Sequence, residues 1–289
     1  MKSSKHGISG FTSIQARETF QRKYVETLHR LWPVPFRTED VATRSGTVRV
    51  YRSGPRGTLP IVLLGGPGGF AASWYKNAGA LSLGREVIAV DPLGELGLSV
   101  QTAAVETAED AVGWLDELLT ATGSQGGHLV GSSTGAWLAL NHQLQTGQGA
   151  SALTLIEPPG LQPQRAYFGC WLLAGKLAAR LPGGLRQRAA RRLRNGALAD
   201  RELGRLARAG DGFRRRLPAP GLLADRQLAA VRIPTTLLLG EHSAQYDRTA
   251  VLGRLEGTAP GIHAETVPGT GHAVAIERPD VVSAAVLAH

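Results

Sequence analysis

The residues best suited to chemistry begin with a serine held between glycines. Residues 131–135 read Gly-Ser-Ser-Thr-Gly, the pattern G-x-S-x-G, with Ser133 at its centre. The apolar run His128–Gly131 leads into this pattern, and a helical pattern from Ala136 follows it. So tight a strand-to-helix turn strains the serine backbone, and the flanking glycines avoid a collision there. The hydroxyl would stand at a helix N-terminus, where the dipole favours negative charge, so we expect Ser133 to be a nucleophile.

A histidine near the other end of the chain is suited to act as the general base. His272 ends a glycine-rich loop, Val-Pro-Gly-Thr-Gly-His, directly after the last predicted strand. An imidazole in such a place can take the proton of a serine hydroxyl during its attack on a carbonyl. Of the other seven histidines, His242 lies in a polar loop and His263 precedes the last strand. Neither shares this loop position, so we expect His272 to be the base.

A second glycine-rich segment is suited to stabilise the negative charge that develops on a carbonyl oxygen. Residues 65–69 read Gly-Gly-Pro-Gly-Gly and follow the apolar run Ile61–Leu64. Such a loop can bring a backbone N–H close to the oxyanion, and the residue after the nucleophile, Thr134, offers another. Because Pro67 has no N–H, Gly66 is the better first donor. We therefore predict an oxyanion hole formed by Gly66 and Thr134.

These segments need a common framework, and the sequence indicates a mostly parallel sheet with crossover helices. Short apolar runs alternate with helical patterns, as in α/β proteins. Several runs are rich in Val, Ile and Leu without polar alternation, which is typical of strands buried on both faces. Apolar spacing also predicts a helix over Ile14–Leu31. The predicted strands are Thr47–Tyr51, Ile61–Leu64, Glu86–Val90, His128–Gly131, Ala152–Ile156, Thr235–Leu239 and Ala264–Val267.

The alternation of strands and helices stops at residues 158–160, Pro-Pro-Gly. From there to about Ala230 the sequence is helical and Arg-rich, and no strand is evident before Ile233. We therefore divide the chain into an α/β core, residues 1–160 and 230–289, and a helical insertion, residues 161–229. An insertion after the sixth strand would form a lid over the carboxyl edge of the sheet. Its candidates for lining an acyl pocket are Phe168, Trp171, Leu172 and Leu173.

The net charge of +9 is concentrated in this insertion. Residues 161–230 hold fourteen Arg and one Lys against four acidic residues, a net +11, which leaves −2 for the remainder of the chain. Charge runs of this kind are usually solvated helix faces. No nucleic-acid reading motif accompanies the arginines, so we expect no nucleic-acid partner. If they serve the active site, they favour an anionic or carrier-bound substrate.

Size and composition narrow the class of protein further. A chain of 289 residues that is 43% hydrophobic can bury a large core as one α/β unit. A single cysteine, Cys170, excludes an intramolecular disulfide and suits a reducing compartment. No apolar run has the length of a signal peptide's core or of a membrane span. We expect a cytoplasmic protein without membrane association, cofactor or metal.

With these segments in this order and spacing, the chain resembles the α/β-hydrolase superfamily over nearly its whole length. That resemblance implies a mostly parallel central sheet flanked by helices, with the helical lid inserted after the sixth strand. The shared blocks are the loop at 65–69, Asp-Pro-Leu-Gly-Glu-Leu-Gly-Leu-Ser at 91–99, the turn at 131–135, Gly-Glu-His-Ser at 240–243 and Gly-His at 271–272.

Within the superfamily, two blocks resemble bacterial carboxylesterases: Trp-Pro-Val-Pro at 32–35 and the stretch around Asp91. The loop at 65–69 resembles the HGGPG loop of proline iminopeptidases, with Leu64 in place of their histidine. The tryptophan that those peptidases carry after the serine is absent, since Thr134 stands there. The resemblance therefore favours an esterase over a peptidase.

The resemblance leaves the acid of a catalytic triad open. Family members usually carry it after the seventh strand, where this sequence has Ser243. Glu157 ends the sixth strand, where some haloalkane dehalogenases carry their acid, and it is the favoured candidate. Glu241 and Asp247 lie near the usual location and are the alternatives. Asp91, at a strand end, is expected to organise its loop.

The resemblance implies a serine hydrolase that cleaves an acyl bond, most simply a carboxylic ester, through an acyl-enzyme on Ser133. The same scaffold also carries cyclases, lyases, acyltransferases, thioesterases and ligand receptors, so a non-hydrolytic role is the alternative. The expected partner is a small-molecule acyl substrate. The sequence sets neither its identity nor the oligomeric state.

Overall fold

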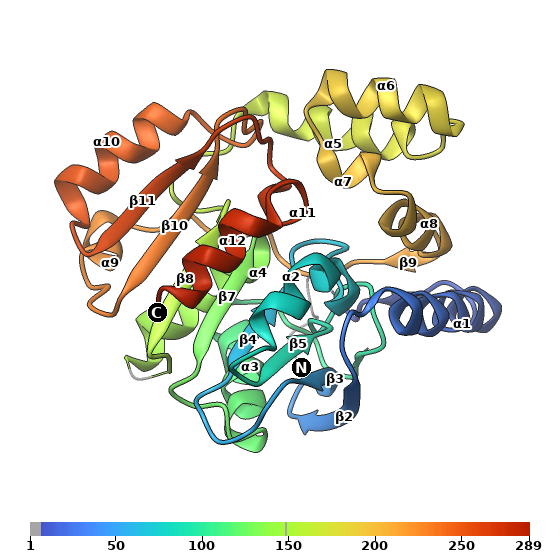
Figure 1. Ribbon diagram of the computed structural model, residues 1–289, viewed down its shortest axis with the longest axis horizontal. Coiled ribbons are helices and arrows are strands. Elements are labelled where there is room, and N and C mark those ends of the chain that lie inside the picture. Colours follow the sequence, from blue (N-terminus) through green and yellow to red (C-terminus); the bar gives the residue numbers. More distant parts are fainter. Residues whose placement is uncertain (1–6, 148) are drawn as a thin grey trace.

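The computed structural model describes residues 7–147 and 149–289, so the first six residues of the predicted core lie outside it. One large, mostly parallel sheet organises the chain (Figure 1), in the order β11-β10-β8-β7-β4-β5-β3-β2 with β6 beside β3. Neighbours from β11 to β5 run parallel, whereas β2, β3 and β6 are antiparallel additions. The strands are β2 (Phe36–Thr43), β3 (Gly46–Ser53), β4 (Ile61–Leu64), β5 (Val87–Val90), β6 (Val100–Gln101), β7 (His128–Ser132), β8 (Ala152–Ile156), β10 (Thr235–Gly240) and β11 (Ile262–Val267).

Helices cover both faces of this sheet because alternate residues of its central strands face opposite ways. In β4, Val62 and Leu64 pack with side chains of α3, α4 and α10. Ile61 and Leu63 pack with side chains of α1, α2 and α12. The helices of the predicted core are α1 (Ile14–Leu31), the 3-10 turn η1 (Ala71–Trp74), α2 (Tyr75–Leu81), α3 (Ala108–Ala121), α4 (Thr134–Thr146), α10 (Arg248–Thr258), α11 (Val274–Glu277) and α12 (Pro279–Leu287). The short helix α9 (Asp225–Leu228), at the end of the predicted insertion, packs with α10 of the core.

The predicted insertion forms its own group of helices: α5 (Ala166–Ala178), α6 (Gly183–Leu193), α7 (Gly196–Ala199) and α8 (Arg201–Ala209). Figure 1 shows α5, α6 and α7 gathered beyond the arrowheads of β10 and β11, while α8 lies near α1. This group therefore stands at the carboxyl end of the strands, where the candidate catalytic residues were expected.

Besides the two-residue strand β6, the sequence analysis missed strands in two other regions. The insertion contains the two-residue strand β9 (Phe213–Arg214), which pairs with β1 (Gly10–Phe11), although no strand was expected before Ile233. The eight-residue strand β2 was also missed, because its charged residues interrupt the apolar pattern. It lies at the edge of the sheet, where polar side chains can find partners across the strand pair.

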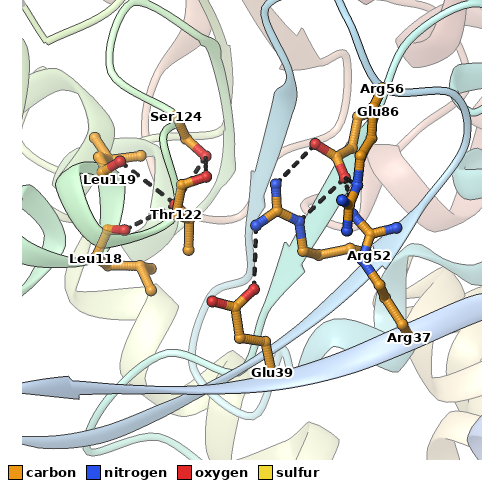
Figure 2. Close-up of polar contacts among 9 residues, drawn as sticks. All are labelled: Arg37, Glu39, Arg52, Arg56, Glu86, Leu118, Leu119, Thr122 and Ser124. Atoms are coloured by element: carbon orange, nitrogen blue, oxygen red, sulfur yellow. Dashed lines mark hydrogen bonds and ion pairs between the residues drawn. The ribbon is translucent and has the colours of Figure 1, made fainter.

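Those partners form an ion-pair cluster that joins three strands (Figure 2). Glu86, directly before β5, accepts hydrogen bonds from Arg37 of β2 and from Arg52 of β3, the latter at 2.8 and 3.1 Å. Arg52 also donates to Glu39 at 3.1 Å. Burial opposes ionisation of Glu86, but its hydrogen bonds from Arg52 and Arg37 outweigh this and lower its pKa. The cluster fixes the antiparallel edge to the parallel core.

Candidate active site

The chain turns sharply from β7 into α4 at Ser133. The serine has φ 52° and ψ −122°, in the positive-φ region that strains a residue with a side chain. A Cβ on Gly131 would lie 2.4 Å from the nitrogen of Ala136, and one on Gly135 would lie 2.2 Å from the carbonyl oxygen of Leu64. Only glycine fits at either position, so the turn has the tight geometry that the pattern predicts.

His272 reaches this serine from the loop between β11 and α11. Its Nε2 lies 3.3 Å from the Oγ of Ser133, which is the distance expected of a serine and its base before substrate binds. The imidazole is 15% exposed, so part of it is accessible to solvent. The two residues, 139 positions apart in sequence, thus meet at the carboxyl edge of the sheet.

Glu157 approaches the same imidazole from the end of β8. Its Oε2 lies 2.9 Å from the Nδ1 of His272, and the carboxyl is fully buried. The Gly240 N–H donates to its Oε1 at 2.7 Å, and the Ser243 hydroxyl donates to its Oε2 at 2.5 Å. Ser243, which stands where relatives usually carry the acid, therefore hydrogen-bonds to the carboxylate on the neighbouring strand.

The two alternative acids make their contacts elsewhere. Glu241 is exposed and accepts a hydrogen bond from the Gly269 N–H at 2.8 Å. Asp247 caps the N-terminus of α10 by accepting from the Ala250 N–H at 3.2 Å. Among the three candidate carboxylates, the structure brings Glu157 to the histidine and leaves the other two in structural roles.

The two predicted oxyanion donors lie beside the serine. A Cβ on Gly66 would lie 2.7 Å from the Cβ and 3.4 Å from the Oγ of Ser133, so the Gly66 backbone passes directly over the nucleophile. Thr134 is the first residue of α4, and the N–H of a first-turn residue has no partner within its helix. Both backbones therefore lie next to Ser133, and their role as oxyanion donors stays a prediction.

Comparison with known proteins shows the family to which this fold belongs. The sequence pattern of the alpha/beta hydrolase family matches residues 61–285. The chain belongs to the α/β hydrolase family. The fold class expected from the sequence is confirmed, and so is the assignment to the hydrolases.

Individual relatives place this α/β hydrolase near bacterial carboxylesterases, as expected. It is 28% identical to carboxylesterase YbfK of Bacillus subtilis over 96% of this chain and 95% of that protein. The crystal structure of YbfK (CesB) covers 95% of this chain and 98% of its own, with a TM-score of 0.83 and 27% identity. The naproxen esterase of Bacillus subtilis gives a TM-score of 0.84 at 26% identity, over 96% of this chain and 98% of its own.

The insertion of this hydrolase touches the imidazole through two aromatic side chains. Phe168 and Trp171 of α5 stack on each other, with ring centroids 5.6 Å apart. Their centroids lie 5.4 and 6.0 Å from that of His272. Leu172 and Leu173 of the same helix are 45% and 60% exposed, so their place in an acyl pocket stays a prediction.

An apolar cavity of about 50 Å³ adjoins the serine turn, and sequence reasoning did not find it. Gly65 and Thr134 border it on the side of the nucleophile. The residues that line it come from α3, α4, the loop after β5 and the chain after β9, and this convergence has no local sequence signal. The larger apolar side chains of its lining are Leu93, Trp114, Trp137, Leu138, Leu217 and Pro218.

Asp91 organises the neighbouring loop, as expected. This fully buried carboxylate accepts hydrogen bonds from the hydroxyls of Tyr24 at 2.6 Å and Tyr51 at 3.1 Å, and from the backbone N–H groups of Ala71 and Leu98, both at 2.8 Å. Burial raises the pKa of Asp91 despite these donors. It therefore ties η1 and the loop after β5 together close to the site.

Within the described residues, no helix is long and apolar enough to cross a membrane.

Proposed function

We propose that this α/β hydrolase is a serine carboxylesterase that cleaves its substrate through an acyl-enzyme on Ser133. The observation that carries the proposal is the position of one imidazole between two groups. His272 has its Nε2 3.3 Å from the strained Ser133 and its Nδ1 2.9 Å from the buried Glu157. A nucleophile, a base and an orienting acid in this order define the chemistry of acyl transfer through serine.

In the proposed reaction the protonation of the imidazole is set by its partners. A carboxylate can only accept hydrogen bonds, so Glu157 holds the proton of His272 on Nδ1 and leaves Nε2 free to accept one. Nε2 takes the proton of Ser133 as its oxygen attacks the ester carbonyl. The backbone N–H groups of Gly66 and Thr134 stabilise the resulting oxyanion.

Collapse of the tetrahedral intermediate breaks the bond to the leaving alcohol, which receives its proton from the imidazolium. Water then attacks the acyl-enzyme by the same route, releasing the carboxylic acid and restoring Ser133. Glu157 stays ionised throughout and stabilises the imidazolium. The buried hydrogen bonds from Gly240 and Ser243 hold this carboxylate in its orientation.

The adjoining cavity supports an uncharged, compact acyl group. Its lining is largely aromatic and aliphatic. Among its lining residues, Arg215 is paired with the buried Glu95 at 2.7 Å, so this cation is not free to recognise an anionic substrate. This favours a neutral ester over the anionic or carrier-bound substrates that the charge of the insertion suggested. Salt-independent kcat/KM would agree with that preference.

The test uses a fluorophosphonate probe and a p-nitrophenyl ester series. We expect labelling at Ser133 and hydrolysis of short esters. The change Ser133→Ala should remove labelling and lower kcat by about 10⁴-fold or more. Ser132→Ala is the matched control, because it removes a hydroxyl from the adjacent position of the same turn and should retain activity. A folded wild-type protein that neither labels nor hydrolyses esters would instead favour the non-hydrolytic alternative.

A further inference from the structure

We propose that Glu277 is a positioning residue that couples the helical insertion to the general base. It resides in α11, five positions after His272. Glu277 acts through the peptide that precedes the histidine and not on the substrate. The inference rests on the proposed function, because it assigns meaning to the placement of His272 as a base.

The carboxylate of Glu277 bridges two segments that are far apart in sequence. Its Oε2 accepts a hydrogen bond from the Gly271 N–H at 2.7 Å, directly before the histidine. Its Oε1 accepts one from the Gly196 N–H at 2.6 Å, at the first residue of α7 in the insertion. Each oxygen serves one segment, and both bonds are of the strong, charge-assisted kind. A shift of α7 would therefore pull on the loop that carries His272.

The two segments also touch without room for side chains. A Cβ on Gly271 would lie 1.9 Å from the carbonyl oxygen of Arg194, and one on Gly196 would lie 2.2 Å from the Cγ of Glu277. On its other side, Gly271 closes on β10, where a Cβ on Gly240 would lie 2.1 Å from the Gly271 oxygen. The peptide before His272 is thus clamped between the sheet and the insertion.

The same part of the insertion reaches the imidazole by a second route. Trp171, whose ring contacts His272, donates from its indole N–H to the carbonyl oxygen of Leu193 at 2.7 Å. Leu193 is followed by Arg194, which has a φ of 48° and presses against Gly271. Residues 193–196 therefore hold both the ring and the backbone of the base. A shift of these residues that misplaces the imidazole by about 1 Å would cost on the order of 100-fold in rate.

The test measures the rate of fluorophosphonate labelling at Ser133 alongside the melting temperature. Glu277→Ala should slow labelling and ester turnover by about 10- to 100-fold in protein that remains folded. Glu277→Gln keeps one carbonyl acceptor, so it should lose less. Asp280→Asn is the matched control, because this nearby carboxylate is exposed, pairs with Arg278 at 2.7 Å and should label at the wild-type rate.

A second pair of variants separates positioning from general stability. Gly196→Ala should slow labelling by itself, because the added methyl collides with the Glu277 side chain. In the Glu277→Ala background the same change should have no further effect, since the atoms that it meets are gone. Additive losses in this cycle would contradict the coupling.

The outcomes also distinguish this inference from the proposed function. Absence of wild-type labelling at Ser133 would overturn the proposed function and the inference with it. Wild-type labelling that is unchanged in Glu277→Ala and Glu277→Gln would overturn the inference alone. A lower melting temperature with unchanged labelling would mean that Glu277 merely stabilises the fold, which also refutes it. Slower labelling in both variants with a normal Asp280→Asn control would support it.

Discussion

The change Glu157→Gln isolates the role of the buried acid with little change in volume. The native carboxylate accepts three hydrogen bonds, from His272, Gly240 and Ser243. A glutamine side chain offers one oxygen and one NH₂ group to these donors. Whichever way the amide turns, its NH₂ group takes the place of one carboxylate oxygen and faces a group that donated to that oxygen. If this NH₂ faces the imidazole, Nδ1 becomes the acceptor and the proton moves to Nε2.

The size of the effect follows from that change of tautomer. With its proton on Nε2, His272 can no longer accept the proton of Ser133 across their 3.3 Å separation. The corresponding acid-to-amide change in other serine triads costs about 10⁴-fold in kcat, or roughly 5.5 kcal/mol of transition-state stabilisation. We expect a loss of that order at neutral pH, with the fold intact.

Steady-state hydrolysis of a short p-nitrophenyl ester measures this loss. Glu241→Gln is the matched control, because it makes the same change on an exposed carboxylate nearby, and it should leave kcat unchanged. Adding Ser243→Asp to Glu157→Gln returns a carboxylate to the place that Ser243 occupies, 2.5 Å from the original Oε2, and should recover at least about tenfold. A Glu157→Gln variant within tenfold of wild-type kcat would refute the assignment of the acid.

Two further predictions concern stability and the cavity. Glu86→Gln should destabilise the fold by about 2 kcal/mol at pH 7, because three strands lose a shared ion pair. Since folding lowers the pKa of Glu86, this contribution is present above its unfolded pKa of about 4.3 and is lost as pH falls through the folded value. Urea unfolding should therefore show that the difference in unfolding free energy between wild type and Glu86→Gln shrinks as the pH falls. A difference that stays constant across pH would contradict the ion pair. Trp137→Ala should enlarge the apolar cavity and raise kcat/KM for octanoyl relative to acetyl esters by about tenfold; an unchanged ratio would place the acyl group elsewhere.

The elements that sequence reasoning predicted well are those with strong local patterns. The helix Ile14–Leu31 and the strands Ile61–Leu64 and Ala152–Ile156 have the expected bounds, because each buries a clear apolar stripe or run. The strand Phe36–Thr43 was missed because its charged residues are satisfied by partners across the sheet edge. The strand at Phe213 consists of two residues and exists through pairing with Gly10 and Phe11, far away in sequence.

The candidate site divides in the same way. Ser133 and Gly66 lie in motifs whose glycines are required by local geometry, so their positions could be predicted. Among the carboxylates, the resemblance favoured Glu157 but left Glu241 and Asp247 open, because the choice depends on the backbone of Glu157 turning to a φ of 52° at the strand end. The cavity wall formed by Trp137 could not be predicted either, since it depends on where a distant segment packs.

Ser243 and Glu157 stand at the ends of adjacent strands and meet within 2.5 Å beside one imidazole nitrogen. Either strand end is thus within reach of the same ring. The acid can therefore move from one strand end to the other as sequences diverge, while the serine and the histidine stay in place. Surveys that identify members of this group by the sequence position of the acid would discard chains like this one. Surveys that require the serine turn and the histidine after the last strand, and accept a carboxylate at either strand end, would retain them.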